Sequence, residues 1–203
     1  MSLRDAYIVK GVDGEHRNTN DYYPTPPIGT LTLLKNHNLP KKLWEPAAGR
    51  GHIAKELIRN GHEVVATDLF PYDNPLVDIE TGVDFMTAER KDVDGVITNP
   101  PFKSNLPEKF IRRMIEVHKY PFVAVFCRLT FMESISRYEL FTDHPPARIY
   151  VLSGRVNCHE DYFEQNHGLG GMVAYAWFVW DELFRQTKGT TKWVKPSDYV
   201  EYL

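Results

Sequence analysis

Short apolar runs alternate with amphipathic segments along most of this chain, which predicts strands alternating with helices. Five runs are rich in β-branched, aromatic and leucine residues and are expected to be buried parallel strands. They span residues 42–45, 63–68, 95–99, 122–129 and 148–152. A longer run at 172–180 follows without a convincing intervening helix, so this last strand is expected to be antiparallel to its neighbour.

The segments between these runs show helical spacing. Residues 52–59 predict a helix after the first strand, and Pro27 is expected to begin a short helix before it. After the third strand, apolar residues recur three and four positions apart, and Asn105 with Glu108 matches a capping box. Residues 132–141 form another amphipathic stretch. This alternation predicts an α/β fold, a doubly wound sheet with helices on both faces and right-handed crossovers.

Composition indicates one ordinary globular domain. The chain has 203 residues, 42% of them hydrophobic and 25% charged, which suffices for a substantial core. Residues 1–21 are polar and without periodicity, so a flexible arm is expected before a domain at 22–203. No run is long enough to cross a bilayer and no signal-peptide pattern begins the chain, so a cytoplasmic protein without a membrane partner is expected.

The charge of the chain constrains its partners only weakly. A net charge of -3 and a pI near 6.2 argue against a surface built throughout to hold phosphate backbones. Basic residues still group at 41–42, 103–113 and 188–195, and one positive face is enough to bind nucleic acid.

Neither the cysteines nor the histidines have the spacing of a metal site. Cys127 and Cys158 show no paired spacing typical of zinc or a redox dithiol, and both are expected to be structural thiols. The 157–171 loop contains potential ligands, but they match no standard site, so no metal is expected and the loop is interpreted as substrate-facing or solvated. These residues are His159, Glu160, Asp161 and His167.

The turn after the first predicted strand is a candidate ligand site. It reads Glu45-Pro46-Ala47-Ala48-Gly49-Arg50-Gly51, and its small residues would let a ligand lie against the backbone. Ligands of open α/β sheets bind beyond the carboxyl ends of the strands, where the turn is expected to lie. Gly49, Gly51 and Ala54 also satisfy the loose dinucleotide fingerprint, which leaves a nicotinamide-binding protein open.

Two acidic positions follow in order. Asp68, with Leu69 beside it, ends the second predicted strand and is placed to accept two ribose hydroxyls. Asp84 precedes Phe85, where a carboxylate could accept a hydrogen bond from an adenine amino group while the purine packs on the ring.

The third predicted strand runs directly into Asn99-Pro100-Pro101-Phe102. The Asn99 side-chain oxygen and the Pro100 carbonyl could accept both hydrogens of a conjugated amino group, which favours a more tetrahedral nitrogen with an available lone pair. The two prolines rigidify the backbone, and Phe102 could stack on a flat substrate. The tetrapeptide therefore predicts group transfer to a planar amine or amide.

These segments, in this order, resemble the adenine-specific DNA methyltransferases, and in particular the small phage and prophage members. The likeness extends from Tyr22 to about Trp180. It includes Tyr23-Pro24-Thr25-Pro26-Pro27, which is similar to the family's N-terminal cofactor motif, together with residues 128–133, 154–156 and 174–180.

The resemblance implies a Rossmann-like, seven-stranded methyltransferase sheet in a bacterial or phage protein, with S-adenosylmethionine as cofactor and DNA as substrate. Thr25 and the Gly49–Gly51 turn would lie near the methionine moiety, Asp68 at the ribose, and Asp84 with Phe85 at the cofactor adenine. The expected catalytic residues are Asn99, Pro100, Pro101 and Phe102. The expected cofactor-binding residues are Tyr23, Thr25, Pro26, Glu45, Pro46, Ala47, Gly49, Gly51, Asp68, Leu69, Asp84, Phe85 and Asn99.

The chain departs from the family pattern in two places. Ala47-Ala48 stands where many methyltransferases carry another glycine, and a separate target-recognition domain is not expected. Specificity would then depend on the loops after Asn99, after Leu129 and at 157–171, or be relaxed.

Other functions stay open at this level. The same tetrapeptide would serve a methyltransferase acting on RNA or on a protein glutamine side chain, although glutamine methyltransferases more often carry tyrosine in place of Phe102. A non-catalytic cofactor-binding protein is a further alternative, and a dehydrogenase would leave the 99–102 segment unexplained. The sequence specifies no oligomeric state.

Overall fold

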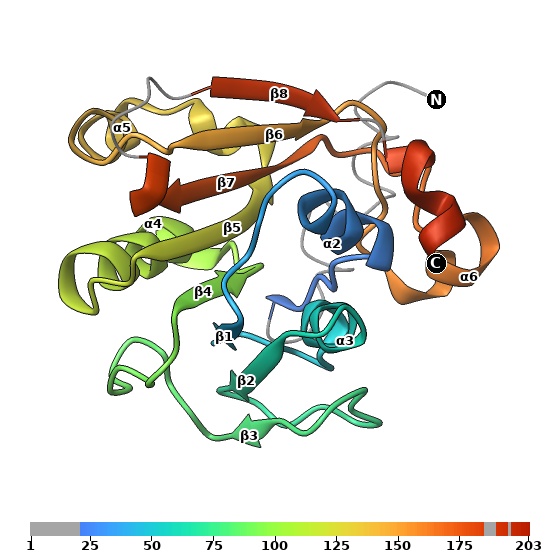
Figure 1. Ribbon diagram of the computed structural model, residues 1–203, viewed down its shortest axis with the longest axis horizontal. Helices are drawn as coiled ribbons and strands as arrows, with labels where there is room; N and C mark the ends of the chain where they lie inside the picture. Colours follow the sequence, from blue (N-terminus) through green and yellow to red (C-terminus); the bar gives the residue numbers. More distant parts are fainter. Residues whose placement is uncertain (1–20, 185–189, 195) are drawn as a thin grey trace.

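The computed structural model describes residues 21–184, 190–194 and 196–203 (Figure 1). These residues form a mixed sheet of eight strands, in the order β3-β2-β1-β4-β5-β7-β6-β8, with helices on both faces. The predicted fold class is thereby confirmed. The predicted arm lies outside the described residues except for its last position, Asp21, which is 7% exposed and accepts a hydrogen bond from the Lys103 backbone N–H at 2.8 Å.

The five predicted parallel strands form within one residue of their expected bounds. They are β1 (Lys42–Glu45), β2 (Glu63–Asp68), β4 (Gly95–Thr98), β5 (Phe122–Arg128) and β6 (Arg148–Leu152). β7 (Tyr175–Asp181) is antiparallel to both β5 and β6, as predicted for the strand at 172–180. Two strands were not predicted: β3 (Glu80–Thr81), which extends the sheet beside β2, and β8 (Thr190–Val194), which pairs in parallel with β6.

Strand β5 shows how the sheet is buried on both faces. Phe122, Ala124 and Phe126 pack with α2 (Pro27–Leu34) and α3 (His52–Arg59). The alternate residues Val123, Val125 and Cys127 pack with α4 (Leu106–Arg112) and α5 (Tyr138–Asp143). Because successive side chains of a strand point to opposite faces, this continuous apolar run feeds two separate cores.

Several local predictions need correction. Asn105 has a φ of 58°, which is incompatible with a capping box, and its amide instead donates to Glu108 Oε2 at 2.8 Å. The stretch at 132–141 is broken by short 3-10 turns before α5. The connection from β6 to β7, expected to lack a helix, contains α6 (Phe163–Asn166). The short turns are η2 (Lys103–Asn105), the π-helical η3 (Arg113–Val117), η4 (Leu129–Met132), η5 (Ile135–Arg137), η6 (Glu160–Tyr162), η7 (Glu182–Phe184) and η8 (Pro196–Tyr202).

The order of strands fixes where a ligand can bind. The chain moves outward from β1 to β3 and then returns to place β4 on the other side of β1. Ligands of such sheets occupy the crevice beyond the carboxyl ends of the strands at this reversal. The candidates after β1, β2 and β4 therefore meet at one edge. Among the described residues, no helix has the length and apolar character needed to span a bilayer.

Candidate active site

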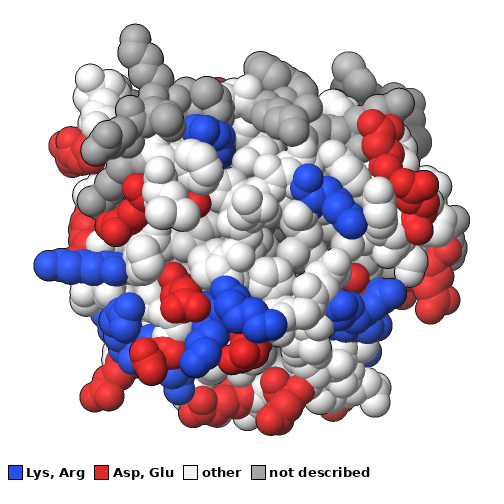
Figure 2. Space-filling model, in the orientation of Figure 1, with Lys and Arg blue, Asp and Glu red and all other residues white. Residues whose placement is uncertain are grey.

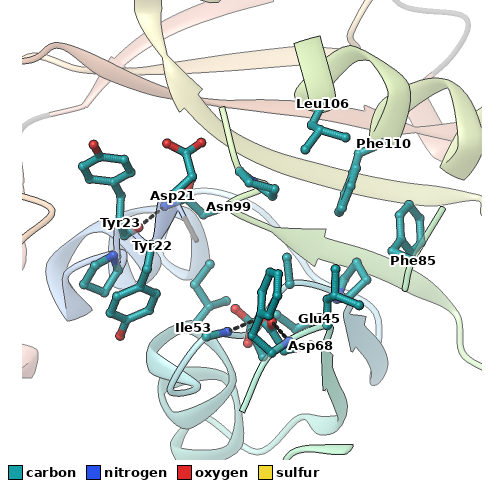
Figure 3. A pocket seen from close by; sticks show the side chains of 18 of the residues that line it. Asp21, Tyr22, Tyr23, Glu45, Ile53, Asp68, Phe85, Asn99, Leu106 and Phe110 are labelled. Carbon is teal, nitrogen blue, oxygen red and sulfur yellow. Dashed lines mark hydrogen bonds between the residues drawn. The ribbon is translucent and has the colours of Figure 1, made fainter. Parts of the chain in front are cut away.

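A pocket of about 460 Å³ opens at the carboxyl ends of β1, β2 and β4, within the volume range of small-molecule sites. In Figure 3, Tyr22, Tyr23 and Asn99 lie on one side, Phe85 and Phe110 on the other, and Glu45 and Asp68 at the strand ends between them. Twelve predicted site residues line this pocket: Tyr23, Thr25, Glu45, Pro46, Ala47, Gly49, Asp68, Leu69, Asp84, Phe85, Asn99 and Pro101.

Four predicted residues do not line the pocket: Pro26, Gly51, Pro100 and Phe102. Gly51 begins α3 with a φ of 87°, and a Cβ there would lie 2.6 Å from the Val77 side chain, so packing within the protein explains this glycine. Pro100 is buried, and Phe102 is half-buried against the core.

Glu45 at the end of β1 stabilises the start of α3. Its side chain is almost fully buried, and Oε2 accepts a hydrogen bond from the Ala54 backbone N–H at 2.8 Å. That N–H belongs to the first helical turn, whose donors have no partner within the helix. Burial raises the pKa of Glu45 well above its usual range, and the neighbouring Asp68 raises it further.

Asp68 connects the end of β2 to the turn after β1. Its Oδ2 accepts a hydrogen bond from the Gly49 N–H at 2.7 Å, and Oδ1 accepts one from the Phe70 N–H at 2.9 Å. Each carboxylate oxygen keeps a further acceptor position. Burial raises the pKa of Asp68.

The pocket wall across from Tyr23 and Asn99 is apolar apart from Asp84. Asp84 Oδ1 accepts a hydrogen bond from the Met86 N–H at 2.9 Å. Phe85 is only 2% exposed, with its ring centroid 5.2 Å from that of Trp44 and 4.5 Å from that of Phe110. Phe85 is therefore chiefly a core residue whose edge reaches the pocket, beside Leu106 and Phe110, which were not predicted as site residues.

Asn99 is held in one orientation just beyond β4. Its Nδ2 donates to the Tyr23 carbonyl at 2.7 Å and to Thr25 Oγ1 at 3.0 Å. A carbonyl can only accept, so the amide nitrogen must face Tyr23. Asn99 Oδ1 is buried without a hydrogen-bond partner among the described residues, and no described donor reaches the Pro100 carbonyl. An unmade hydrogen bond at a buried acceptor costs about 1–3 kcal/mol, and a donor on a molecule bound in the pocket could make this one.

The rim of the pocket carries four residues that were not among the predicted site residues, although Arg50 lies in the candidate turn and Glu160 in the loop interpreted as substrate-facing or solvated. Glu160, in the 157–171 loop, accepts hydrogen bonds from the Tyr22 hydroxyl, from Arg50 and, at 2.8 Å, from His52 Nε2. We call Tyr22, Arg50, His52 and Glu160 the rim cluster. Tyr22 and His52 are sequence neighbours of the predicted residues Tyr23 and Gly51, and only this proximity in the sequence could have indicated them.

The rim cluster has a clear charge assignment. Burial opposes ionisation of Glu160, but its hydrogen bonds with Tyr22 and His52 outweigh that cost and hold the pKa of this carboxyl below its usual range. Burial lowers the pKa of His52, so the neutral imidazole donates through Nε2 at neutral pH. The Tyr22 ring also fills the space that a Cβ on Gly49 would need, at 2.4 Å.

The face of the molecule seen in Figure 2 carries mixed charge. Lys and Arg side chains are interspersed there with Asp and Glu. Lys41 and Lys42 adjoin the amino end of β1, at the edge opposite the pocket, and Arg112 is paired with Glu108 at 3.0 Å and Glu116 at 2.8 Å. Of the third expected basic group, residues 188, 189 and 195 lie outside the described residues.

No protein-family model matches the sequence, and no curated protein is significantly similar to it. Solved structures with a similar fold include a protein of Listeria monocytogenes assigned to the class I S-adenosylmethionine-dependent methyltransferases. That pair has 12% identity and a TM-score of 0.58, and the match covers 95% of this chain and 71% of the other.

Two further solved structures with a similar fold come from Vibrio vulnificus and Pyrococcus horikoshii. A modification subunit assigned to a type I restriction enzyme of Vibrio vulnificus has 15% identity and a TM-score of 0.56, over 98% of this chain and 54% of that subunit. A protein of Pyrococcus horikoshii assigned as an RNA methyltransferase has 14% identity and a TM-score of 0.55, over 86% and 94% of the two chains. At these identities the likeness shows the class I methyltransferase fold, and this chain spans about half of the restriction subunit.

Proposed function

We propose that this protein transfers a methyl group from S-adenosylmethionine to the exocyclic amino nitrogen of adenine in DNA. The methyltransferase fold supports the reaction class. The observation that carries the proposal is the geometry of Asn99, which lines the same pocket as Gly49 and Asp68. Tyr23 and Thr25 hold its amide nitrogen, while its oxygen has no hydrogen-bond partner among the described residues.

The residues of the pocket fit this cofactor. Asp68 keeps acceptor positions for ribose hydroxyls, and Asp84 Oδ2 accepts from no described residue, so it can take a purine amino group. Leu69, Phe85 and Phe110 supply an apolar wall suited to a flat purine. When bound, S-adenosylmethionine supplies an electrophilic methyl group on a positively charged sulfur.

Asn99 and Pro100 would act on the target amine. The lone pair of adenine's amino nitrogen is delocalised into the ring, which makes the nitrogen a poor nucleophile. Accepting both amino hydrogens favours a tetrahedral nitrogen whose lone pair is available for attack. The fixed amide of Asn99 needs no reorganisation at the moment of reaction, which is the basis of electrostatic catalysis by preorganised groups.

The substrate can be identified directly. Native protein is incubated with isotopically labelled methyl donor and separate pools of duplex DNA, RNA and cell protein, after which each pool is digested and its methylated product identified. We expect N6-methyladenine from DNA. Label in RNA adenine or in protein glutamine would replace the DNA assignment with one of the two alternative substrates.

The role of Asn99 is tested with two variants. Asn99→Ala should lower the turnover number about a hundredfold to a thousandfold, the usual cost of losing one preorganised polar group, while donor affinity measured by calorimetry stays near the native value. Asn60→Ala, at the exposed C-terminus of α3, is the matched control and should retain native turnover. Near-native turnover by Asn99→Ala would contradict the proposal.

A further inference from the structure

Arg128, at the end of β5, holds a half-buried positive charge that has no counter-ion among the described residues. Its guanidinium carbon lies 5.1 Å from the ring centroid of Phe102 and 6.0 Å from that of Tyr23. Its Nε is buried, and within the described part of the chain this atom has no hydrogen-bond partner and no carboxylate forms an ion pair with the guanidinium. Its polar neighbour is the hydroxyl of Tyr175, which carries no charge.

Three other arginines of the described residues form ion pairs with carboxylates. Arg50 pairs with Glu160, Arg59 with Glu56 and Arg112 with Glu108. Taking a cation out of water without an anionic partner is costly, so a retained charge of this kind indicates an anion that is supplied by another molecule.

The position of Arg128 identifies where that anion would lie. β4 and β5 are parallel neighbours with Thr98 opposite Val125, so Asn99 and Arg128 follow the same edge of the sheet. Phe102, the ring expected to stack on the target base, is in contact range of the guanidinium. The anion would therefore lie next to the base that Asn99 acts on.

The chemistry of the guanidinium suits a phosphate. Aromatic rings stabilise a guanidinium by contact with its flat face, which leaves its in-plane N–H donors available. These donors form a planar fork that matches two phosphate oxygens. One side of Phe102 is then occupied by Arg128, so a base would have to use the other side of the ring.

We infer that Arg128 binds a backbone phosphate adjacent to the target base. The inference rests on the proposed function and narrows its substrate class to polynucleotides, because a protein glutamine carries no obligatory anion beside its amide. A single well-placed cation is compatible with a net charge of -3 and with the mixed charges on the face seen in Figure 2.

The test measures binding of fluorescent duplex DNA and single-stranded RNA by anisotropy over a series of KCl concentrations. Arg128→Met keeps the length of the side chain and removes its charge. It should weaken duplex binding about threefold to tenfold and make the slope of log affinity against log salt shallower by about 0.9. Arg128→Lys should restore the slope but only part of the affinity, because lysine lacks the planar fork.

Arg90→Met is the matched control. The Arg90 guanidinium carbon lies 4.6 Å from the Tyr120 ring centroid, and its Nε donates to the His118 carbonyl, near the start of β5 and away from the pocket. The slope of log affinity against log salt for Arg90→Met should equal that of native protein. Donor affinity by calorimetry should be native in all variants, which shows that each is folded.

The outcomes distinguish the phosphate contact of Arg128 from the proposed methylation of DNA. A native salt slope in Arg128→Met, with DNA methylated normally by native protein, overturns the phosphate contact alone. Failure of native protein to bind either nucleic acid also overturns it. Absence of methylated DNA in the pooled assay overturns the proposed function, whatever the salt slopes show.

Discussion

Substitution of Glu160 tests whether the rim cluster maintains the pocket. Glu160→Gln replaces a carboxylate that accepts hydrogen bonds from three side chains with an amide that offers one oxygen and introduces N–H donors opposite Arg50. A buried hydrogen bond to a charged group contributes about 1.5–3 kcal/mol, whereas an exposed ion pair contributes about 0–1 kcal/mol. The Glu160 side chain is 26% exposed, so we place the combined loss at about 2 kcal/mol.

Thermal unfolding and calorimetry measure this effect. A loss of about 2 kcal/mol corresponds to a fall in Tm of roughly 4–8 °C for a chain of this size. Donor affinity should fall severalfold, because Tyr22 and His52 line the pocket. The control is Asp161→Asn, whose side chain is 80% exposed and pairs only with His159, at 3.5 Å, among the described residues.

The pH dependence of Tm gives a second test of the role of Glu160. The folded-state pKa of Glu160 is depressed, so its contribution is present at neutral pH and is lost as pH falls through that pKa. The difference in Tm between native protein and Glu160→Gln should shrink accordingly in acid. If the variant melts with native protein at neutral pH, the cluster does not stabilise the fold; if it melts lower but binds donor normally, the cluster does not shape the pocket.

Three other substitutions or treatments have defined outcomes. Burial raises the pKa of Glu45 above its unfolded value, so native Tm should fall as pH rises from the unfolded-state pKa through the folded-state pKa. Glu45→Gln should lack that component, and superimposable pH series would contradict the assignment. Burial raises the pKa of Cys158 to about 12 and also raises that of Cys127, so mass spectrometry should detect iodoacetamide adducts at neutral pH only after unfolding, and rapid native labelling would be inconsistent with two buried thiols. Gly49→Ala should lower Tm and donor affinity, since φ is 58° and the new Cβ would lie 2.4 Å from the Tyr22 ring; the conformational penalty alone is about 1–2 kcal/mol, and native melting would argue against it.

The core of the sheet could be predicted because its strands are short, apolar runs that are buried on both faces. β5 is the clearest case, since six successive residues, 122–127, are at most 2% exposed. β3 has no such signal: Glu80 and Thr81 are both exposed, and only pairing with β2 makes them a strand. β8 was missed because it is defined by pairing with β6, which lies far upstream in the sequence.

The residues of the site likewise fall into those that the sequence could predict and those that it could not. Residues at strand ends could be predicted because the order of strands alone brings them to one edge, and Asp68 and Asn99 line one pocket for that reason. Contacts between distant segments carry no local pattern. Glu160 meets His52 across 108 positions, and Arg128 meets Phe102 only after β4 and β5 have paired.

The sheet ends on one side at β3, which is only two residues long. Exposed strand edges act as templates on which another copy of a chain can add a strand, and proteins resist this with short edges and charged side chains. Both devices are present here, because Glu80 within β3 forms an ion pair with Lys91 at 3.1 Å. This edge therefore offers too little unpaired backbone for a neighbouring molecule to extend the sheet, which protects the protein from edge-to-edge aggregation on this side.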